Sequence, residues 1–265
     1  MDLERFRLRT FLESLPPEEL QRVEEPTALA DVAAVHDGNR KAVWFRDAAG
    51  AELAANVTAS RSRLALAFGT TPGNLLAEVR ARLARPQRIV EVRSAPAQEV
   101  VEAQPDLTAL PVHLQHAFDG APYISASMDF TRDGERTNVG IRRLMLRGRR
   151  EAGVDLNAPS DLRAIYQAAA GRGERVPIAF VVGSHPVDHV AAAMRLPGDE
   201  LNLMASLRGT ELPVVKCLTS ELRVPADAEY VLEGYLDERG YAEPEGPYGE
   251  FLGYYGALKA NPVFH

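Results

Sequence analysis

The chain has 265 residues and a formal net charge of -7, which argues against a nucleic-acid backbone or an anionic membrane as its main partner. A single cysteine, Cys217, excludes an internal disulfide and a metal site made of thiolates alone, and its strand-like surroundings predict a small core residue. The charged N-terminus has no signal-peptide core, and no apolar run approaches the roughly twenty residues that span a bilayer, so we expect a soluble, cytoplasmic protein.

The first third of the chain mixes helical and strand patterns. Residues 3–15 carry apolar side chains at helical spacing, and a Pro-Pro pair then opens a second short helix through about residue 23. Three short apolar runs within residues 41–69 predict strands, a helix follows over residues 71–83, and residues 88–92 predict another strand. This order is typical of an α/β domain.

A segment punctuated by prolines, over residues 94–122, shows little periodicity and predicts a domain boundary. We place the boundary between an N-terminal α/β domain, residues 1–105, and a second domain, residues 106–265. His113 and His116 lie in the boundary segment, three positions apart. They would suit a metal only on a helix, which the proline just before them disfavours.

The second domain is predicted to consist mostly of strands with inserted helices. Residues 123–131 and 137–148 predict a β-hairpin around a turn at 132–135. Ser160 is a suitable cap for a helix over residues 161–170. The remaining predicted elements are a buried strand at 177–183, helices at 185–194 and 198–207, and three strands within VVKCL, ELRV and EYVLEGYL.

Residues 245–250 read Glu-Gly-Pro-Tyr-Gly-Glu and place two carboxylates five residues apart, separated mostly by glycine and proline. Glycine opens backbone angles that are closed to other residues and proline fixes its own φ, so we expect a stiff, irregular loop rather than a helix or strand. Such a loop can hold Glu245 and Glu250 at a set separation, as chemistry requires when one acid gives a proton and the other stays charged. The alternative is a surface turn with solvated acids.

Arg143 lies in the second strand of the predicted hairpin. Strand alternation puts it on the same face as Val139 and Ile141. A guanidinium among apolar side chains is costly to bury unless it meets an anion. Arg143 therefore either binds a carboxylate or phosphate, or lies at a sheet edge and reaches solvent along its stem.

Asn138 and Glu200 offer oxygen ligands. Glu200 is predicted in the first turn of a helix, where an acid is favourable for the helix dipole alone. If these two side chains converge with further oxygens, they suit a hard cation such as magnesium or manganese that bridges phosphate oxygens. His185, in Gly-Ser-His-Pro, is expected to shape a turn.

Taken in order, several stretches resemble the UbiD-like family of prenylated-FMN-dependent decarboxylases. This many motifs in one order are more specific than any one of them, and they cover residues 100–265 densely and the opening third more loosely. The matching stretches are Asp106 with LPVH at 110–113, GAPYIS at 120–125, NVGIRR at 138–143, VVGSHP at 181–186, the acidic pair ending in Glu200, RVPADAEYVLEG at 223–234, and EGPYGEFLGYY at 245–255.

The resemblance implies both a fold and a function. The fold would be an N-terminal α/β domain packed on a β-rich, flavin-reductase-like split barrel that holds the cofactor. The activity would be the reversible, non-oxidative decarboxylation of an aromatic, heteroaromatic or α,β-unsaturated carboxylic acid. Prenylated FMN from a flavin prenyltransferase would be the electron sink, alongside manganese or magnesium and potassium. The protein would act on a small molecule as a homo-oligomer, without a nucleic-acid or membrane partner.

The resemblance also implies roles for single residues. Glu250 would be the proton donor, and Arg143 with Glu245 would form the ion network that orients it. Asn138 and Glu200 would hold the metal that ties the cofactor phosphate to the protein. The cofactor contacts would come from Asn138, Ile141, Arg142, Arg143 and Glu200.

Three features depart from the family pattern. Arg142 stands where the family usually has an aromatic residue, which indicates an anionic substituent on the substrate or a solvent-facing arginine. No histidine stands at the position of the third metal ligand, so Asp155 or Asn157 would have to substitute. Family members continue through a C-terminal domain that supplies a cofactor-contacting lysine and much of the oligomer interface, and we expect that domain to be absent here.

Two other hypotheses stand beside the decarboxylase. The chain is a non-catalytic flavin-binding fragment or subunit that needs a partner chain to complete its site, or it is a structural remnant without flavin. Activity of the purified chain with reconstituted cofactor would exclude the former. A colourless protein that never takes up flavin would support the latter.

Overall fold

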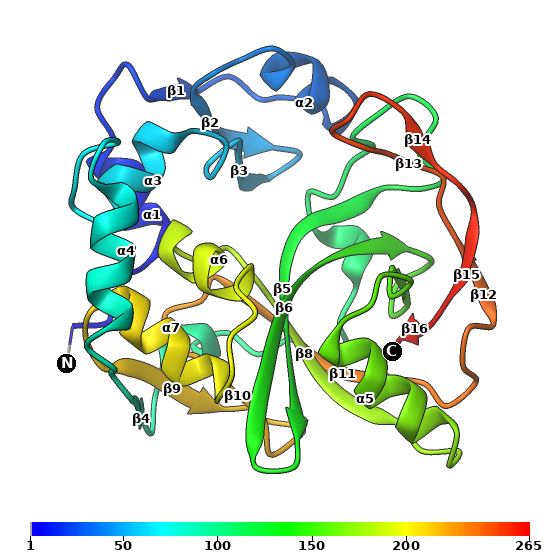
Figure 1. Cartoon of the computed structure of the whole chain (residues 1–265). Helices are drawn as coiled ribbons and strands as arrows, with labels where there is room; N and C mark the ends of the chain where they lie inside the picture. Colours follow the sequence, from blue (N-terminus) through cyan, green and yellow to red (C-terminus); the bar gives the residue numbers. More distant parts are fainter. Residues whose placement is uncertain (1) are drawn as a thin grey trace.

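A six-stranded closed β-barrel forms the centre of the structure, a computed structural model that describes residues 2–265 (Figure 1). The strands follow the order β11-β16-β7-β6-β5-β8 around the barrel. They are β5 (Tyr123–Asp133), β6 (Arg136–Leu146), β7 (Ala152–Val154), β8 (Val176–Val182), β11 (Tyr230–Leu236) and β16 (Val263–Phe264). The predicted combination of an α/β region with a β-rich barrel is confirmed.

The hairpin β5–β6 is the longest pair in the barrel, and its tip projects away from the other strands in Figure 1. The register runs from Tyr123 opposite Met145 to Asp133 opposite Arg136, with an irregularity between Ile124 and Ser127. Gly134 has a φ of 61°, a backbone conformation that glycine adopts without strain, so the chain reverses there. The predicted hairpin is confirmed, with β5 extending two residues beyond its predicted end and β6 ending two residues before its predicted end.

A small sheet of order β1-β2-β3 lies at the N-terminal end of the chain, beside α1 (Leu8–Ser14). The helix predicted up to residue 23 is wrong, because β1 (Leu20–Val23) pairs in parallel with β2 (Ala42–Ala48). Backbone pairing with a distant strand outweighs the local preference of these few residues. β3 (Ala51–Ala55) completes the sheet, and β2 and β3 confirm two of the three predicted strands.

Two short helices flank this sheet, and neither was expected from the sequence. The third apolar run, predicted as a strand, belongs to α3 (Arg61–Ala67). A short apolar run fits a strand or a buried helix equally well, and here the Ser60 hydroxyl accepts a hydrogen bond from Arg63 N and caps a helix. α2 (Leu29–His36) buries Val32 against the sheet through a hydrophobic cluster that includes Phe45.

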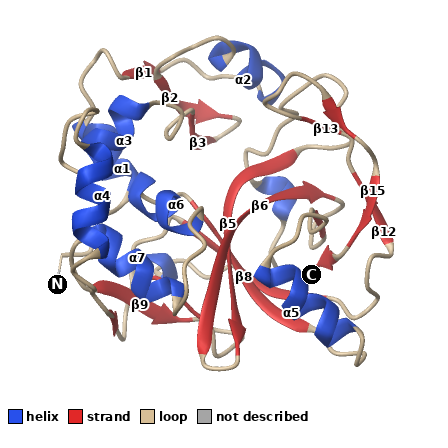
Figure 2. Cartoon of the chain, viewed as in Figure 1, coloured by secondary structure: helices blue, strands red, loops and turns tan. Residues whose placement is uncertain are grey.

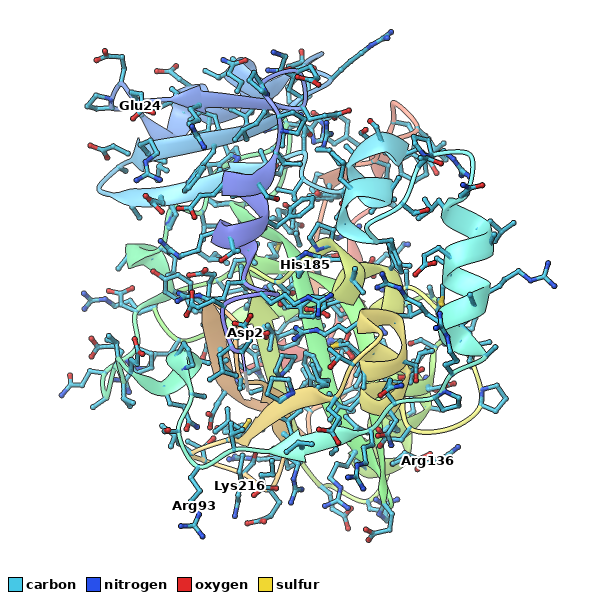
Figure 3. All side chains as sticks on the ribbon, turned by 90° about the vertical axis from the view of Figure 1, so that its left-hand side faces the viewer. Asp2, Glu24, Arg93, Arg136, His185 and Lys216 are labelled. Carbon is cyan, nitrogen blue, oxygen red and sulfur yellow. The ribbon has the colours of Figure 1, made fainter. Side chains whose placement is uncertain are left out.

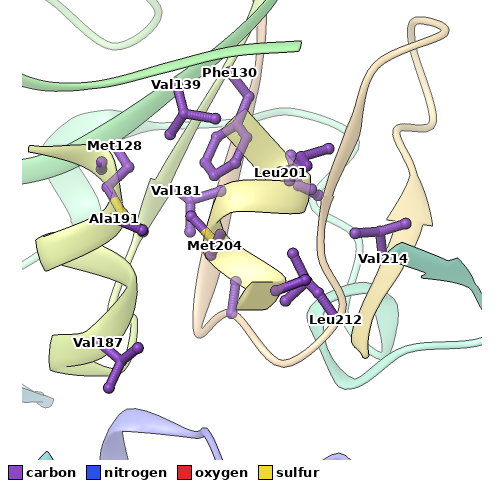
Figure 4. Packing of buried hydrophobic residues seen from close by; sticks show 14 of the residues in the cluster. Met128, Phe130, Val139, Val181, Val187, Ala191, Leu201, Met204, Leu212 and Val214 are labelled. Atoms are coloured by element: carbon purple, nitrogen blue, oxygen red, sulfur yellow. The ribbon is translucent and has the colours of Figure 1, made fainter. Parts of the chain in front are cut away.

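The largest hydrophobic core lies between the barrel and a layer of helices (Figure 4). Met128, Phe130 and Val181 from the barrel meet Leu201 and Met204 from α7. The layer contains α4 (Leu75–Leu83), α6 (Pro186–Ala192), α7 (Glu200–Arg208) and a sheet of order β10-β9-β4, with β4 (Ile89–Glu91), β9 (Leu212–Lys216) and β10 (Arg223–Pro225). These helices and strands agree with those predicted.

The parallel pairing of β4 with β9 joins strands from both sides of residue 105. The division of the chain at that residue stays a prediction. Between β4 and the barrel the chain forms two short 3-10 helices, Pro96–Gln98 and Leu107–Ala109. Cys217 follows β9 and is buried in the large core, as predicted, and burial raises the pKa of its thiol to about 12.

α5 (Asp161–Ala170) stands apart from the other helices, on the opposite side of the barrel from α1, α3, α4, α6 and α7 (Figure 2). Ser160 caps it as predicted, by accepting a hydrogen bond from Arg163 N. His185 caps α6 and lies between Phe6 and Phe11, with ring centroids 5.1 and 5.0 Å away. In Figure 3 it lies near the middle of the molecule.

The stretch 245–250 was predicted to be an irregular loop, and this is partly wrong. Glu245 ends β12 (Glu243–Glu245), which pairs with β15 (Lys259–Asn261). β13 (Tyr248–Gly249) then pairs with β14 (Tyr255–Gly256). Strands β14 and β15, which come later in the chain, pair with residues 243–249. These backbone pairings give the segment more strand structure than its glycine and proline content indicates. No helix within residues 2–265 is long and apolar enough to cross a membrane.

Candidate active site

Arg143 joins three carboxylates that come from distant parts of the chain. Its Nε donates to Glu245 Oε1 at 3.0 Å and its Nη2 to Glu245 Oε2 at 3.2 Å. Its Nη1 donates to Glu250 Oε1 at 2.9 Å, and Nη2 also lies 3.1 Å from Asp155 Oδ2. Arg143 lies on strand β6, Glu245 is the last residue of β12, and Glu250 directly follows β13.

Aromatic rings and an amide enclose the same guanidinium. Its central carbon lies 4.6 Å from the ring centroid of Tyr248 and 5.9 Å from that of Tyr123. Asn261 Nδ2 donates to Glu245 Oε2 at 3.3 Å. Cation–π contacts of this kind stabilise a cation that has lost part of its water. The guanidinium and the Glu245 carboxylate therefore have partners on several sides.

Burial and the neighbouring charges shift the pKa values of Arg143 and Tyr123. Burial lowers the pKa of Arg143, but the hydrogen bonds and charge of Glu245 outweigh it, so the pKa is raised overall. Burial and the charge of Glu245 raise the pKa of Tyr123. Arg143 therefore stays cationic and Tyr123 stays a neutral phenol near neutral pH.

The two glutamates differ in their access to solvent. The side chain of Glu245 is 1% exposed, whereas that of Glu250 is 30% exposed. Glu250 is therefore accessible to a molecule outside the cluster, as is Asp155 at 27% exposure, whereas the buried Glu245 makes two hydrogen bonds to the guanidinium.

A second group of predicted residues lines a cavity of about 300 Å³ beside the barrel. Asn138, Ile141, Arg142 and Glu200 all contribute to its wall, together with Arg195. The structure therefore brings together four of the five predicted cofactor contacts. Arg143, the fifth, does not line this cavity and belongs to the carboxylate cluster.

Asn138 and Glu200 are in direct contact. Asn138 Nδ2 donates to Glu200 Oε2 at 2.9 Å, and Val139 N donates to the same oxygen. Burial raises the pKa of Glu200, although the Val139 N–H opposes the shift. Glu200 Oε1 receives no hydrogen bond within residues 2–265 and is available to a ligand. The prediction that Glu200 lies in the first turn of a helix is confirmed, with Asp199 as the cap.

The expected third metal ligand does not join this pair. Asp155 contacts Arg143, and Asn157 donates to Asp155 Oδ1 and to Asn261 Oδ1. Neither residue lines the cavity that holds Asn138 and Glu200. Within residues 2–265 there is no group of three His, Cys, Asp or Glu side chains that could hold a metal ion. Any metal at Asn138 would therefore need ligands from the molecule that it binds or from water.

Comparison with known proteins assigns the family. A family model described as 3-octaprenyl-4-hydroxybenzoate carboxy-lyase Rift-related domain matches residues 88–265, more than half of the chain. The chain belongs to the UbiD family. The N-terminal domain model of the same carboxy-lyase matches residues 17–83 of this UbiD protein.

Individual relatives of this UbiD protein are decarboxylases or UbiD-class enzymes. The anhydromevalonate phosphate decarboxylase of Methanosarcina mazei is 29% identical over 248 residues, which are 93% of this chain and 58% of that protein. An evolved dimeric form of the UbiD-class enzyme HmfF from Pelotomaculum thermopropionicum, in complex with prFMN, superposes with a TM-score of 0.89 at 30% identity, covering 97% of this chain and 63% of that one.

The vanillic acid decarboxylase of Sedimentibacter hydroxybenzoicus in its closed form gives a TM-score of 0.90 at 28% identity, covering 97% of this chain and 60% of that one. The UbiD chain described here thus spans between 58% and 63% of the length of these three relatives.

Several polar residues of the site were not singled out from the sequence. Asp129 is fully buried, and neither of its carboxylate oxygens has a hydrogen-bond partner within residues 2–265. It lies 3.5 Å from Arg142 Nε, and burial raises its pKa to about 6 against the charge of Arg142. Asp129 on β5 lies opposite Gly140 on β6, and strand alternation puts Gly140 on the same face as Arg142. The alternation of the two predicted strands is therefore the signal that could have found Asp129. Asp119, which accepts a hydrogen bond from Gly249 N, was likewise not singled out.

Proposed function

We propose that the chain carries the cofactor-phosphate site and the proton donor of a decarboxylase that depends on prenylated FMN. The substrate would be an aromatic, heteroaromatic or α,β-unsaturated carboxylic acid, and the reaction would be reversible and non-oxidative. The observation that carries the proposal is the direct link of Arg143 to both Glu245 and Glu250, within a chain of the UbiD family.

The residues around the cavity suit the phosphate end of a flavin. Arg142 Nε is buried without a hydrogen-bond partner within residues 2–265, and Arg195 adds a second cation to the wall. Gly140, also in the wall, lets the buried Asp129 carboxylate approach the backbone, because a Cβ there would lie 2.8 Å from Asp129 Oδ1. Asn138 and Glu200 offer an amide and a carboxylate oxygen, which suit magnesium or manganese bound jointly with phosphate. A flavin held there would supply the electron sink for loss of carbon dioxide.

The chain's own residues would then orient the acid and deliver the proton. Arg143 keeps Glu250 at a fixed place by a single hydrogen bond while Glu245 holds the other edge of the guanidinium. Glu250 would protonate the carbon that has lost its carboxylate, and the reverse reaction would use the same residue as base. The nearly complete burial of Glu245 keeps the field of the ion network fixed during the transfer.

The remaining partners follow from the same proposal. A flavin prenyltransferase would supply the cofactor, potassium would accompany the divalent metal, and the protein would act as a homo-oligomer. Aromatic and conjugated acids form the substrate panel, with vanillic acid and anhydromevalonate phosphate included because the relatives act on them. Arg142 and Arg195 favour a substrate or cofactor with an anionic group away from the reacting carbon.

The replacement Glu250→Gln tests the proposal in protein produced together with a flavin prenyltransferase. We expect turnover to disappear while bound flavin, measured by absorption and by mass spectrometry of the extracted ligand, stays at the unaltered level. Glu243→Gln is the matched control, because Glu243 is another partly exposed glutamate, in the neighbouring strand β12, that pairs with Arg147 and Arg239 instead of Arg143. Loss of flavin together with activity in Glu250→Gln would contradict the assigned role.

An exposed apolar surface beside Glu250 favours a second candidate, a flavin-binding subunit that another polypeptide completes. Phe251 is 93% exposed, Leu252 64% and Tyr254 57%, an unusual density of apolar surface next to a reactive acid. In that case the purified chain would bind flavin but show no turnover on any acid of the panel. Turnover by the chain alone with reconstituted cofactor would exclude this candidate.

A further inference from the structure

Asp119 links the segment before the barrel to the loop that carries Glu250. Its Oδ1 accepts a hydrogen bond from Gly249 N at 2.7 Å, across 130 residues of sequence. We propose that Asp119 is a positioning residue that fixes Glu250 for proton transfer. This inference rests on the proposed function, because it assumes that Glu250 is the proton donor.

The second oxygen of Asp119 ties it to its own segment. Asp119 Oδ2 accepts from His116 N at 2.9 Å and from Gln115 N at 3.1 Å. The side chain is 0% exposed, so water cannot replace these three bonds. A buried carboxylate that accepts backbone N–H groups is held far more rigidly than one that only faces another flexible side chain.

Close backbone contacts reinforce the link. Gly120 N donates to Pro247 O at 2.8 Å, and a Cβ on Gly120 would come within 2.2 Å of Gly246 O. A Cβ on Gly249 would come within 2.3 Å of His116 Nδ1. Glycine at positions 120 and 249 therefore lets the two segments touch on both sides of Asp119.

The link reaches the proton donor through one peptide. Gly249 directly precedes Glu250, so the bond from Gly249 N to Asp119 fixes the backbone from which Glu250 extends towards Arg143. Burial raises the pKa of Tyr248, and the charge of Asp119 adds to the shift. A displacement of about 1 Å in a reacting group can lower a rate by about 100-fold.

The replacement Asp119→Asn keeps the shape of the side chain and removes one acceptor. The amide oxygen can serve Gly249 or the pair Gln115 and His116, but not both. We expect kcat for decarboxylation to fall about 10- to 100-fold, with KM and flavin content within twofold of the unaltered protein. The solvent deuterium isotope effect on kcat should increase, because proton delivery becomes slower than the other steps.

Asp237→Asn is the matched control. Asp237 is also buried and accepts from a backbone N–H, that of Arg239 at 3.2 Å, but it contacts His265 rather than the Glu250 loop. We expect its kcat and isotope effect to stay unchanged. An unchanged kcat in Asp119→Asn, or a fall that matches the loss of flavin, would overturn the inference.

Amide hydrogen exchange of the unaltered protein tests the same link without any variant or activity. We expect the Gly249 amide to exchange slowly, and exchange at the rate of exposed amides would overturn the inference. If the unaltered protein shows slow Gly249 exchange but no decarboxylation, the proposed function fails while the link stands. If it decarboxylates and Asp119→Asn keeps the full kcat, only the positioning role fails.

Discussion

Two arginines are each surrounded by carboxylates in this UbiD protein, and the two surroundings differ in how far they are closed. Arg208 of α7 makes four hydrogen bonds of 2.6 to 2.9 Å to Asp188 and Asp227. All three side chains are at most 2% exposed, and Phe6 covers the guanidinium at 4.7 Å. Arg143 faces three carboxylates, of which Glu250 is 30% exposed and Asp155 27%.

The difference separates a structural ion network from one suited to chemistry. Each Arg208 nitrogen that faces Asp188 or Asp227 donates a hydrogen bond to a carboxylate oxygen. The three side chains are buried, so neither solvent nor a ligand reaches the network. The Arg143 network has three acids around one guanidinium, and two of them, Glu250 and Asp155, are partly exposed to solvent. A closed network contributes to the unique packing of a core, whereas an open one with a partly exposed acid can exchange a proton.

The largest effect is expected where the closed network loses its cation. Arg208→Ala would leave Asp188 and Asp227 buried without a counter-charge, which costs about 3–5 kcal/mol in the free energy of unfolding. Urea denaturation followed by circular dichroism measures this change. A loss below about 1 kcal/mol would show that water enters the network, and would remove the distinction between the two clusters.

Arg143→Lys should affect catalysis more than folding. A lysine keeps the charge but cannot bond Glu245 through two parallel contacts and also hold Glu250, so we expect kcat to fall about 100-fold, equivalent to about 3 kcal/mol. The free energy of unfolding should change by no more than about 1 kcal/mol, since the network is partly open to water. Arg208→Lys is the matched control and should lower stability but leave kcat per folded molecule unchanged. Equal losses of kcat in the two variants would contradict the comparison.

His185, next to the buried network of Arg208, is expected to make the free energy of unfolding depend on pH. Burial lowers its pKa to about 4, and it lies beside Asp188 and Arg208. The unfolded chain binds a proton below about pH 6.5, so the full stability is present above that pH and is lost as the pH falls towards 4. At about 1.4 kcal/mol per pH unit, the loss reaches about 2 kcal/mol at pH 5.

His185→Asn isolates this effect, because asparagine can still cap α6 but does not titrate. We expect the difference in the free energy of unfolding between pH 7.5 and pH 5 to be about 2 kcal/mol smaller in the variant than in the unaltered protein. Urea denaturation at the two pH values measures it. The same pH dependence in both proteins would place the titrating group elsewhere.

Local sequence patterns predicted the elements that depend on local contacts. The alternation in residues 123–148 predicts the hairpin, and Ser160 predicts the start of α5. The interpretation failed at β1, whose strand pairing comes from β2, about twenty residues away, and at α3, where a short apolar run fits either structure. At β1 a contact outside the segment decides the conformation, whereas at α3 the local cap at Ser60 marks a helix that the apolar run alone does not distinguish from a strand.

In the candidate active site, too, the contacts between residues far apart in the sequence could not be predicted from local patterns. The cost of burying Arg143 left two alternatives open, an anionic partner or a stem that reaches solvent, and only the resemblance to the UbiD-like family implied that Glu245 and Glu250 are its partners. The bond between Asp119 and Gly249 joins residues 130 positions apart, and no local pattern marks either as a partner. Arg208 likewise looks like an ordinary basic residue in the last turn of a helix until its two acids are seen.

The smallest effect is expected for an arginine–carboxylate pair outside both networks. Arg172 lies within hydrogen-bond distance of Glu174, but the two side chains are 59% and 56% exposed. Water solvates each charge whether or not the pair forms, so Arg172→Gln should leave the urea midpoint unchanged within error. The salt dependence of the midpoint should be equally unaffected. A shift as large as that of Arg208→Lys would mean that the number of contacts, rather than their enclosure, sets the contribution of an arginine in this fold.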